Sequence, residues 1–508
     1  MNKGEFPAIG EAQAGIQLYP AGVGIRRILA FIFFILVAFY LLNLIVPYGG
    51  EGLFKDPDIF WHMTVGEKIW RTGSLPHVDE FSHTFLGQPW IAKEWLGQLF
   101  FYAAYAGAGW RGVVLLAATV SALTYALLFL TLARNMRLTI AVGISTAAYI
   151  FSMDQFNLRP YIFAYPLIIL WVAGLLRAVE SGAAPSLLLL PVLALWANVH
   201  GSFTFGLAIA AALAAEAFLN SSADRRRETA QRWAIFLGAA LCFACLTPYG
   251  YGSMLTTFQV FVGNDALNYI PEWMPLTLEA LSVNNAIIFS LLFLAIFYGT
   301  KIPAWRSMII ISVTYMMFRH VRFIALFSIV VPILLLTPLT SQFPYLRLTD
   351  QIREQPLFFA GIARASSRFI YPLGFMIIIG AATFGAYGPQ VSPRPNMTPA
   401  GAVDYIYKEH LTGNVYNFYA FGGYLIFRGI KTFVDGRSDQ LFGNGFLTRL
   451  VRITRESPED FIPYLDEYNV SIALVVPGHL DTQELERSSH WQMVYSDNVS
   501  VLFRKRDH

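Results

Sequence analysis

Long apolar segments recur along most of this 508-residue chain, and short charged segments separate them. A transmembrane helix needs about 20 predominantly apolar residues, and most of the segments reach or approach that length. The pattern therefore predicts a polytopic α-helical membrane protein of about 11 spans. The expected spans are 28–46, 112–133, 138–152, 160–177, 183–198, 202–219, 232–247, 284–300, 305–318, 321–340 and 369–387.

The basic residues of the connecting segments predict the orientation, because cytoplasmic loops are enriched in Lys and Arg. The connection at 248–283 has no Lys or Arg, but it has Asp265, Glu272 and Glu279. An odd number of spans with a cytoplasmic N-terminus then places the tail on the periplasmic or extracellular side. In this orientation the inside loops carry Arg134, Arg137, Arg225, Arg226, Arg227, Arg232, Lys301, Arg306, Arg347, Arg353, Arg364 and Arg368.

Two polar regions on the outer side are large. The first is a loop at 48–94 with an expected helix at 58–71, and the short apolar segment 95–110 that follows it is expected at the membrane interface. The second is the tail, with expected helices at 399–411 and 457–468. Its strand-like runs are NVYNF, GGYLIF, KTFVDG, VSIALVV, WQMVYS and VSVLF. We therefore predict a transmembrane module at 1–388 and a small extracytoplasmic α/β domain at 389–508.

Composition agrees with the membrane class. Hydrophobic residues make up 56% of the chain and charged residues 14%, whereas about 25% of a soluble domain is charged. The net charge of +3 is too small to indicate a nucleic-acid partner. Cys242 and Cys245 lie within an apolar segment, where two small buried hydrophobic residues are expected rather than a redox or metal pair.

The segment directly after the first expected span concentrates acidic and imidazole groups. Asp56, Asp58 and His62 fall within seven positions, and on a helix that begins near Asp58, His62 lies one turn on and shares its face. A carboxylate there can act as a general base, or hold a divalent cation together with His62. The structural alternative is that Asp58 caps the helix. Glu94, where the chain returns to the membrane, either faces the same pocket, or pairs with Lys93 or serves as a carboxylate at a helix start.

Further polar groups are expected at the outer ends of the spans, where ionisable side chains are costly unless they are used or paired. Arginines beside a groove can bind a lipid phosphate through two parallel hydrogen bonds. Their alternative roles are snorkelling to the interface or, for Arg159, pairing with Asp154. In the tail, Gly422-Gly423 and Asp435-Gly436-Arg437 are typical of tight turns, and Asp435 and Arg437 either reach over the pocket or only shape a turn. The span-end candidates are Arg159, His200, Arg319, His320 and Arg322.

The chain resembles the GT-C superfamily of membrane glycosyltransferases, and within it a group of bacterial proteins. The matching stretches are DPDIFWHMTVGEKIWRTGSLPHVDEFSHT, PWIAKEWLGQ, WANVHGSF, LTPYG, and NFYAFGGYLIF with FVDGRSD. The resemblance implies a GT-C-like enzyme of the bacterial inner membrane, with a cytoplasmic N-terminus and an acidic first outer loop. Many members carry an adjacent Asp-Glu pair in that loop, where this chain has Asp-Pro-Asp.

The resemblance further implies transfer of a sugar from a polyprenyl-phosphate donor to a lipid, glycan or protein acceptor, with membrane lipid as a further partner. The first-loop acid of the family is the proposed base, which corresponds here to Asp58, with Asp56 as the alternative. The expected reaction inverts the sugar, and arginines such as Arg159, Arg319 or Arg322 hold the leaving phosphate. Members differ in whether they need a metal ion. The remaining expected substrate-binding residues are His62, Glu94, His200, His320, Asp435 and Arg437.

A secondary transporter or a flippase for lipid-linked sugars is the alternative function. Such proteins usually have related halves, broken helices and polar sites near the membrane centre. The two halves of this chain show no repeat, and its polar residues gather at one face. The pattern therefore favours an enzyme over a transporter.

Overall fold

The computed structural model describes residues 54, 56–261, 265–277, 288, 290, 297–347, 393 and 398–506. The predicted spans at 28–46 and 369–387, most of the one at 284–300, and most of the linker that opens the tail lie outside the described residues. The described part is mostly helical and ends in a small domain with a mixed four-stranded sheet.

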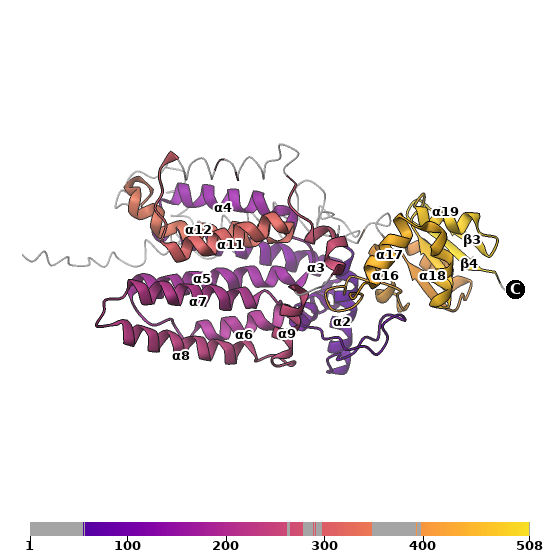
Figure 1. Ribbon diagram of the computed structural model, residues 1–508, viewed down its shortest axis with the longest axis horizontal. Coiled ribbons are helices and arrows are strands. Elements are labelled where there is room, and N and C mark those ends of the chain that lie inside the picture. Colours follow the sequence, from indigo (N-terminus) through magenta and orange to yellow (C-terminus); the bar gives the residue numbers. More distant parts are fainter. Residues whose placement is uncertain are drawn as a thin grey trace, which may run out of the picture.

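The helices that precede the C-terminal domain form an elongated bundle (Figure 1). Among the described residues, four segments are long and apolar enough to cross a membrane, namely Trp95–Leu132, Pro160–Ser181, Phe203–Asn220 and Val321–Gln342. They indicate a multi-pass membrane protein. The bundle helices are α3 (Trp95–Leu132), α4 (Leu138–Ser152), α5 (Ala164–Ser181), α6 (Leu189–Val199), α7 (Phe203–Asn220), α8 (Arg226–Ala244), α11 (Ala304–Arg319) and α12 (Ile324–Gln342).

Helix α5 packs against α3, α6, α7 and α12, and its Trp171 is completely buried. Trp171 Nε1 donates a 2.8 Å hydrogen bond to the carbonyl oxygen of Gly206 in α7, which satisfies a polar group that is costly to bury unpaired. At the end of the bundle away from the C-terminal domain, buried Arg306 of α11 pairs with Glu216 of α7 (Nε to Oε1, 2.9 Å) and with Glu180 of α5 (Nη1 to Oε1, 3.1 Å). These contacts tie three helices together at that end.

Helix α3 is broken near its middle. Ala108 and Gly109 have non-helical backbone angles, with φ at +60° in Gly109. A Cβ atom on Gly112 would lie 2.1 Å from the carbonyl oxygen of Ala104, although residues eight apart in a straight helix are separated by roughly 12 Å. The chain therefore bends sharply here, and residues 95–107 are not collinear with the apolar part at 112–132. The prediction of a separate short segment at 95–110 agrees with this break.

The C-terminal domain combines helices with one sheet in the order β1-β2-β4-β3. Strand β1 is parallel to β2, and β4 is antiparallel to both β2 and β3. Apolar side chains of the strands and helices are buried on both sides of the sheet. The elements are α15 (Ala400–Lys408), β1 (Asn414–Asn417), α16 (Gly422–Phe427), α17 (Phe446–Arg455), α18 (Phe461–Glu467), β2 (Val470–Val475), α19 (Leu480–Arg487), β3 (Trp491–Ser496) and β4 (Val501–Lys505).

Four of the six predicted strands and both predicted tail helices are confirmed, but two strand predictions are wrong. GGYLIF forms helix α16, so Gly422-Gly423 begins a helix instead of turning between strands. KTFVDG contributes only an isolated bridge between Thr432 and Ser82. Packing explains the first error, because a Cβ on Gly423 would lie 2.5 Å from the carbonyl oxygen of Pro57.

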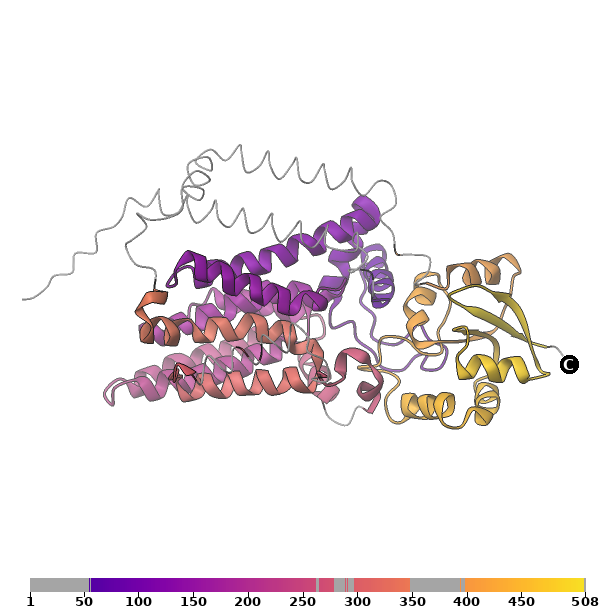
Figure 2. The ribbon, with the colours of Figure 1, turned by 90° about the horizontal axis from the view of Figure 1, so that it is seen from above.

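Helix α2 (Asp58–Thr72) and the loop after it lie between the bundle and the C-terminal domain (Figures 1 and 2). The prediction of a helix at 58–71 is confirmed. A second link comes from Asp265, at the start of the short helix η4 (Asp265–Tyr269). Its Oδ2 accepts a 3.1 Å hydrogen bond from the Gly445 N–H and another from the Thr448 hydroxyl. Gly445 is the N-cap of α17 and has no capping side chain, so Asp265 caps that helix from a distant part of the chain.

Candidate active site

A cavity of about 440 Å³ lies where the bundle, the first loop and the C-terminal domain meet. Its walls come from the start of α2, the end of the first loop, the ends of several bundle helices, and the tail segments around Tyr419 and Gly436. Many of the predicted site residues, which are far apart in sequence, are brought together here. Those that line the cavity are Asp56, Asp58, His62, Glu94, Arg159, His200 and Arg322.

Asp56 and Asp58 have different roles at the start of α2. Asp56 Oδ1 accepts a 3.0 Å hydrogen bond from the Asp58 N–H, while α2 has no side-chain cap at Pro57. Asp56 therefore accepts a hydrogen bond from the first backbone N–H of the helix. The alternative of Asp58 as the N-cap is wrong, because Pro57 holds that position. Asp58 and His62 both face the cavity, as their spacing of one helical turn predicted.

Arg159 lies between three carboxylates. Its Nη2 is 2.7 Å from Asp58 Oδ2 and donates a 3.1 Å hydrogen bond to Asp56 Oδ1, while its Nε also contacts Asp56. Its Nη1 donates a 2.7 Å hydrogen bond to Glu272 Oε1. These contacts join Arg159 to Asp56, Asp58 and Glu272, whereas the predicted alternative partner was Asp154.

Burial of the Asp58 carboxyl raises its pKa to about 7. The Arg159 charge opposes this increase, and the charges of Asp56, Glu272 and Asp435 add to it. A carboxyl with a pKa near 7 is half-ionised at neutral pH, which suits a group that exchanges protons with a substrate.

Glu94 is a second carboxyl of the cavity, with a side chain only 16% exposed, and loss of solvent raises its pKa to about 7. Its Oε1 lies 3.3 Å from His200 Nε2 and its Oε2 lies 4.0 Å from His62 Nε2. Burial lowers the pKa of both histidines well below the usual value, so they are neutral at pH 7. The alternative pair of Glu94 with Lys93 does not form, because Lys93 Nζ contacts Asp439 instead.

Arg322 lines the cavity beside Glu272 and Trp273. Its guanidinium carbon lies 4.3 Å from the centroid of the Trp273 ring, and its Nη1 is 3.5 Å from Glu272 Oε1. His320 is turned to the backbone, with Nδ1 at the carbonyl oxygen of Trp273, and it does not line the cavity. Arg319 is exposed and is also outside the cavity. The structure therefore separates Arg322 from the two neighbours predicted with it.

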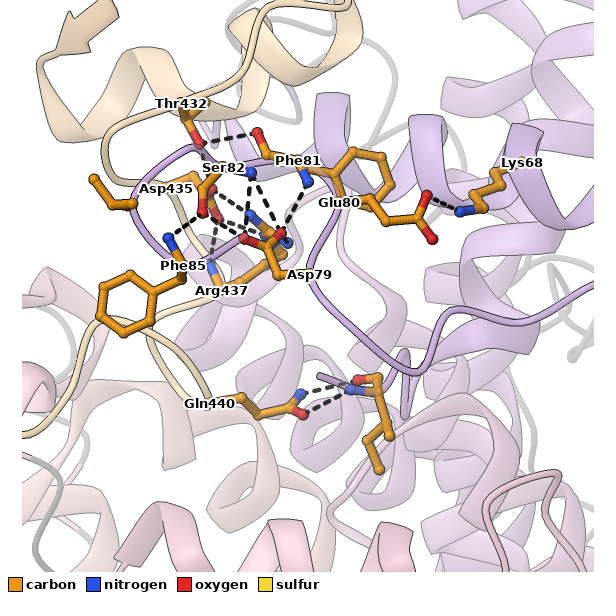
Figure 3. Close-up of polar contacts among 12 residues, drawn as sticks. Lys68, Asp79, Glu80, Phe81, Ser82, Phe85, Thr432, Asp435, Arg437 and Gln440 are labelled. Atoms are coloured by element: carbon orange, nitrogen blue, oxygen red, sulfur yellow. Dashed lines mark hydrogen bonds and ion pairs between the residues drawn. The ribbon is translucent and has the colours of Figure 1, made fainter. Parts of the chain in front are cut away.

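Asp435 and Arg437 form a buried ion cluster behind the cavity wall (Figure 3). Arg437 donates 2.7 Å hydrogen bonds from Nε and Nη2 to the two carboxylate oxygens of Asp435, and its Nη1 contacts Asp79 of the first loop. Neither Asp435 nor Arg437 lines the cavity. Gly436 between them does, and a Cβ atom there would lie 2.1 Å from Asp58 Oδ1. The cluster thus places a glycine backbone directly against Asp58.

Glu272 and Trp273 line the cavity but were not among the predicted site residues. A signal was present, since Glu272 is one of three acids in a connection without basic residues. Gln98 is a further lining residue that was not predicted. It lies one helical turn after Glu94, and its Nε2 donates a 3.1 Å hydrogen bond to His62 Nδ1.

The carboxylates do not fit a divalent cation. In the described part of the chain, no three His, Cys, Asp or Glu side chains are arranged to hold a metal ion. The position between Asp56, Asp58 and Glu272 is taken by the Arg159 guanidinium. The positive charge that these carboxylates need is therefore supplied by the protein.

No protein-family model matches this sequence, and no curated protein sequence matches it either. The function is therefore argued from the cavity itself.

Proposed function

We propose that this protein is a GT-C-type membrane glycosyltransferase that transfers a sugar from a polyprenyl-phosphate donor to a lipid, glycan or protein acceptor. The observation that carries the proposal is the cavity at one end of the apolar helices, where Arg322 and Arg159 lie beside the carboxyls of Asp58 and Glu94. Such a cavity offers cations for a phosphate and proton acceptors for a hydroxyl group at one place.

Arg322 is the arginine best suited to the donor phosphate. Arg159 already makes ion pairs with three carboxylates, whereas the one polar contact of Arg322 among the described residues is the 3.5 Å approach to Glu272. A guanidinium has five N–H donors in a planar fork that matches two phosphate oxygens. A cation–π contact with the Trp273 ring orients the Arg322 guanidinium.

The lining also suits a sugar. Trp61, Trp90 and Trp273 supply flat apolar surfaces. Two buried atoms of lining residues, Trp61 Nε1 and Gln98 Oε1, lack a hydrogen-bond partner within the described residues. One is a donor and the other an acceptor, and a sugar hydroxyl can satisfy either kind.

In the proposed reaction a buried carboxylate takes the proton of an acceptor hydroxyl. The hydroxyl oxygen then forms a bond to the anomeric carbon of the sugar as the bond from that carbon to the phosphate oxygen breaks. The bonding electrons leave with the lipid phosphate, whose charge faces Arg322. The phosphate needs no proton to leave, so one carboxylate is sufficient, and it passes its proton to water afterwards.

We further propose about 11 spans in a bacterial inner membrane, with the N-terminus cytoplasmic and the cavity and C-terminal domain outside. In the described bundle, the chain passes from α7 to α8, which begins at Arg226, at the end away from the C-terminal domain (Figure 1), and Arg306 pairs with Glu216 near that end of α7, which agrees with the orientation. We expect Arg226→Cys, in a chain with Cys242 and Cys245 replaced by Ala, to be shielded from a membrane-impermeant thiol reagent in intact cells. Glu80→Cys in the same background should react. Labelling of both positions, or of Arg226→Cys alone, would contradict the topology.

The phosphate role of Arg322 is tested with the purified protein and a synthetic polyprenyl-phosphate sugar. We expect Arg322→Ala to weaken donor binding by roughly 10²-fold, since a charge-assisted hydrogen bond to a buried group contributes about 1.5–3 kcal/mol. Arg322→Lys should restore only part of this loss. Arg319→Ala is the matched control, because Arg319 is exposed three positions away, and it should bind donor like the wild type.

Equal donor binding by the wild type, Arg322→Ala and Arg319→Ala would remove Arg322 from the proposal. Movement of the lipid-linked sugar across vesicles without any sugar transfer would instead support a transporter or flippase.

A further inference from the structure

The two carboxyls with a raised pKa differ in what surrounds them. Asp58 Oδ2 lies 2.7 Å from Arg159 Nη2, and the backbone of Gly436 closes over the same carboxylate. Among the described residues, no ion pair joins Glu94 to an arginine, and its two oxygens approach imidazole nitrogens. The pKa of about 7 is the same for both carboxyls, but an oxygen that a guanidinium already contacts is less open to a substrate hydroxyl than one that no arginine contacts.

The backbone determines which nitrogen of His200 carries a proton. His200 Nδ1 accepts a 3.2 Å hydrogen bond from the Ser202 backbone N–H. Because that N–H can only donate, the proton of the neutral ring must lie on Nε2, the atom 3.3 Å from Glu94 Oε1. His200 therefore turns the N–H of Nε2 toward Glu94, 3.3 Å from Oε1, while Oε2 lies 4.0 Å from His62 Nε2.

Charged groups from several other elements face Glu94. Lys93 and Asp439 form a contacting pair of opposite charge at the cavity wall, and their effects on Glu94 oppose each other. Arg322 and Arg159 lie further along the cavity and favour the ionised form of Glu94. Glu94 is thus close enough to both arginines to sense them without being bound by either.

We infer that Glu94, oriented by His200, is the proton acceptor of this site, and that Asp58 holds Arg159 in place as a positioning residue. This inference rests on the proposed function and deepens it. The proton of the sugar acceptor's hydroxyl moves to Glu94 Oε2, and the hydroxyl oxygen bonds to the anomeric carbon. The bond between that carbon and the phosphate oxygen breaks, and its electron pair leaves with the phosphate. His200 stays neutral throughout and donates to Oε1.

The experiment compares Glu94→Gln and Asp58→Asn in the full-length protein with a synthetic polyprenyl-phosphate sugar at saturating concentration. We expect Glu94→Gln to lower turnover by roughly 10²–10⁴-fold, as loss of a general base does, while donor binding stays within about twofold of the wild type. Asp58→Asn should show the opposite pattern, with weaker donor binding and turnover within about tenfold. Thermal unfolding checks that both variants are folded, and Glu94→Asp, which keeps the carboxylate, should retain measurable turnover.

The pH profile separates catalysis from a structural role. Turnover of the wild type should rise with pH, with its midpoint near 7, and level off above it, because the base acts in its ionised form. His200→Leu removes a donor to the carboxylate, so it should shift this rise to higher pH and keep the maximal rate within about tenfold. A merely structural role of His200 would lower the rate without moving the profile.

The outcomes distinguish the two proposals. If the wild type transfers the sugar and Glu94→Gln is equally fast, the assignment of Glu94 as the base is overturned. The proposed function then stays intact. A loss of turnover in Asp58→Asn with unchanged donor binding returns the base to Asp58. A folded wild type that neither binds the donor nor transfers its sugar overturns both.

Discussion

Arg437→Met is expected to lower the free energy of unfolding by about 3–5 kcal/mol, because it leaves buried carboxylates without their cation. The Arg437, Asp79 and Asp435 side chains are completely buried. The Arg437 guanidinium also lies beside the rings of Phe81 and Trp90, 5.3 and 5.1 Å from their centroids (Figure 3 shows Phe81). The first loop and the C-terminal domain share this cluster, so its loss should separate them. Thermal unfolding and limited proteolysis of the purified protein measure both effects.

Arg449→Met is the matched control for that experiment. Arg449 makes two hydrogen bonds with Glu467, at 2.6 and 2.8 Å, but both side chains are almost half exposed. Exposed pairs contribute about 0–1 kcal/mol, so this variant should unfold almost like the wild type. Adding Asp79→Asn and Asp435→Asn to Arg437→Met should recover much of the lost stability. Equal stability of Arg437→Met and Arg449→Met would show that the buried cluster does not hold the domain.

Arg159→Met, a substitution in the cavity itself, is expected to lower the free energy of unfolding by a similar amount. Three carboxylates within 3.1 Å of the Arg159 guanidinium would lose their closest cation, and the breaking of such a buried pair costs about 3–5 kcal/mol. The lost charge should raise the pKa of Asp58 and Glu272 in the folded protein, so the folded state would bind more protons than the unfolded state. Stability of the variant should therefore fall as pH rises.

The measurement is thermal unfolding of the wild type and Arg159→Met at pH 5 and pH 8. The loss of unfolding free energy in Arg159→Met should be larger at pH 8, where Asp58 and Glu272 must ionise. Asp56→Asn in the Arg159→Met background should reduce the loss of stability. The stability of Arg159→Lys should lie between that of the wild type and that of Arg159→Met. Arg232→Met, which removes an exposed pair with Glu228, controls for loss of charge alone. An equal loss at both pH values would contradict the electrostatic explanation.

The junction between bundle and C-terminal domain explains why the cavity needs the whole chain. Asp56, Asp58 and Glu94 come from the first loop, Arg159, His200 and Arg322 from ends of bundle helices, and Gly436 from the tail. The Arg437 cluster, the Asp265 cap on α17, and the paired hydrogen bonds between Gln440 and the Ile91 backbone hold these parts together. The C-terminal domain therefore forms part of the site.

The local pattern of the sequence was sufficient to locate most elements of this protein. Apolar segments predicted the bundle helices to within a few residues, except that α6 begins later and α8 earlier than expected. Alternating β-branched and aromatic residues located β1 to β4. The face shared by Asp58 and His62 also followed from helical spacing. In all these cases the deciding interaction lies within a few residues along the chain.

Only the tertiary structure decided which polar groups meet. Arg159 binds carboxylates at positions 56 and 272, and Arg437 binds one at position 79, which no local period can encode. GGYLIF became a helix because Gly423 packs against the Pro57 backbone, although its composition is typical of a strand. Arg319 and Arg322 are alike in sequence, yet only Arg322 enters the cavity. The physical reason is that the energy of a buried charge depends on its partners, and folding brings those partners from distant parts of the chain.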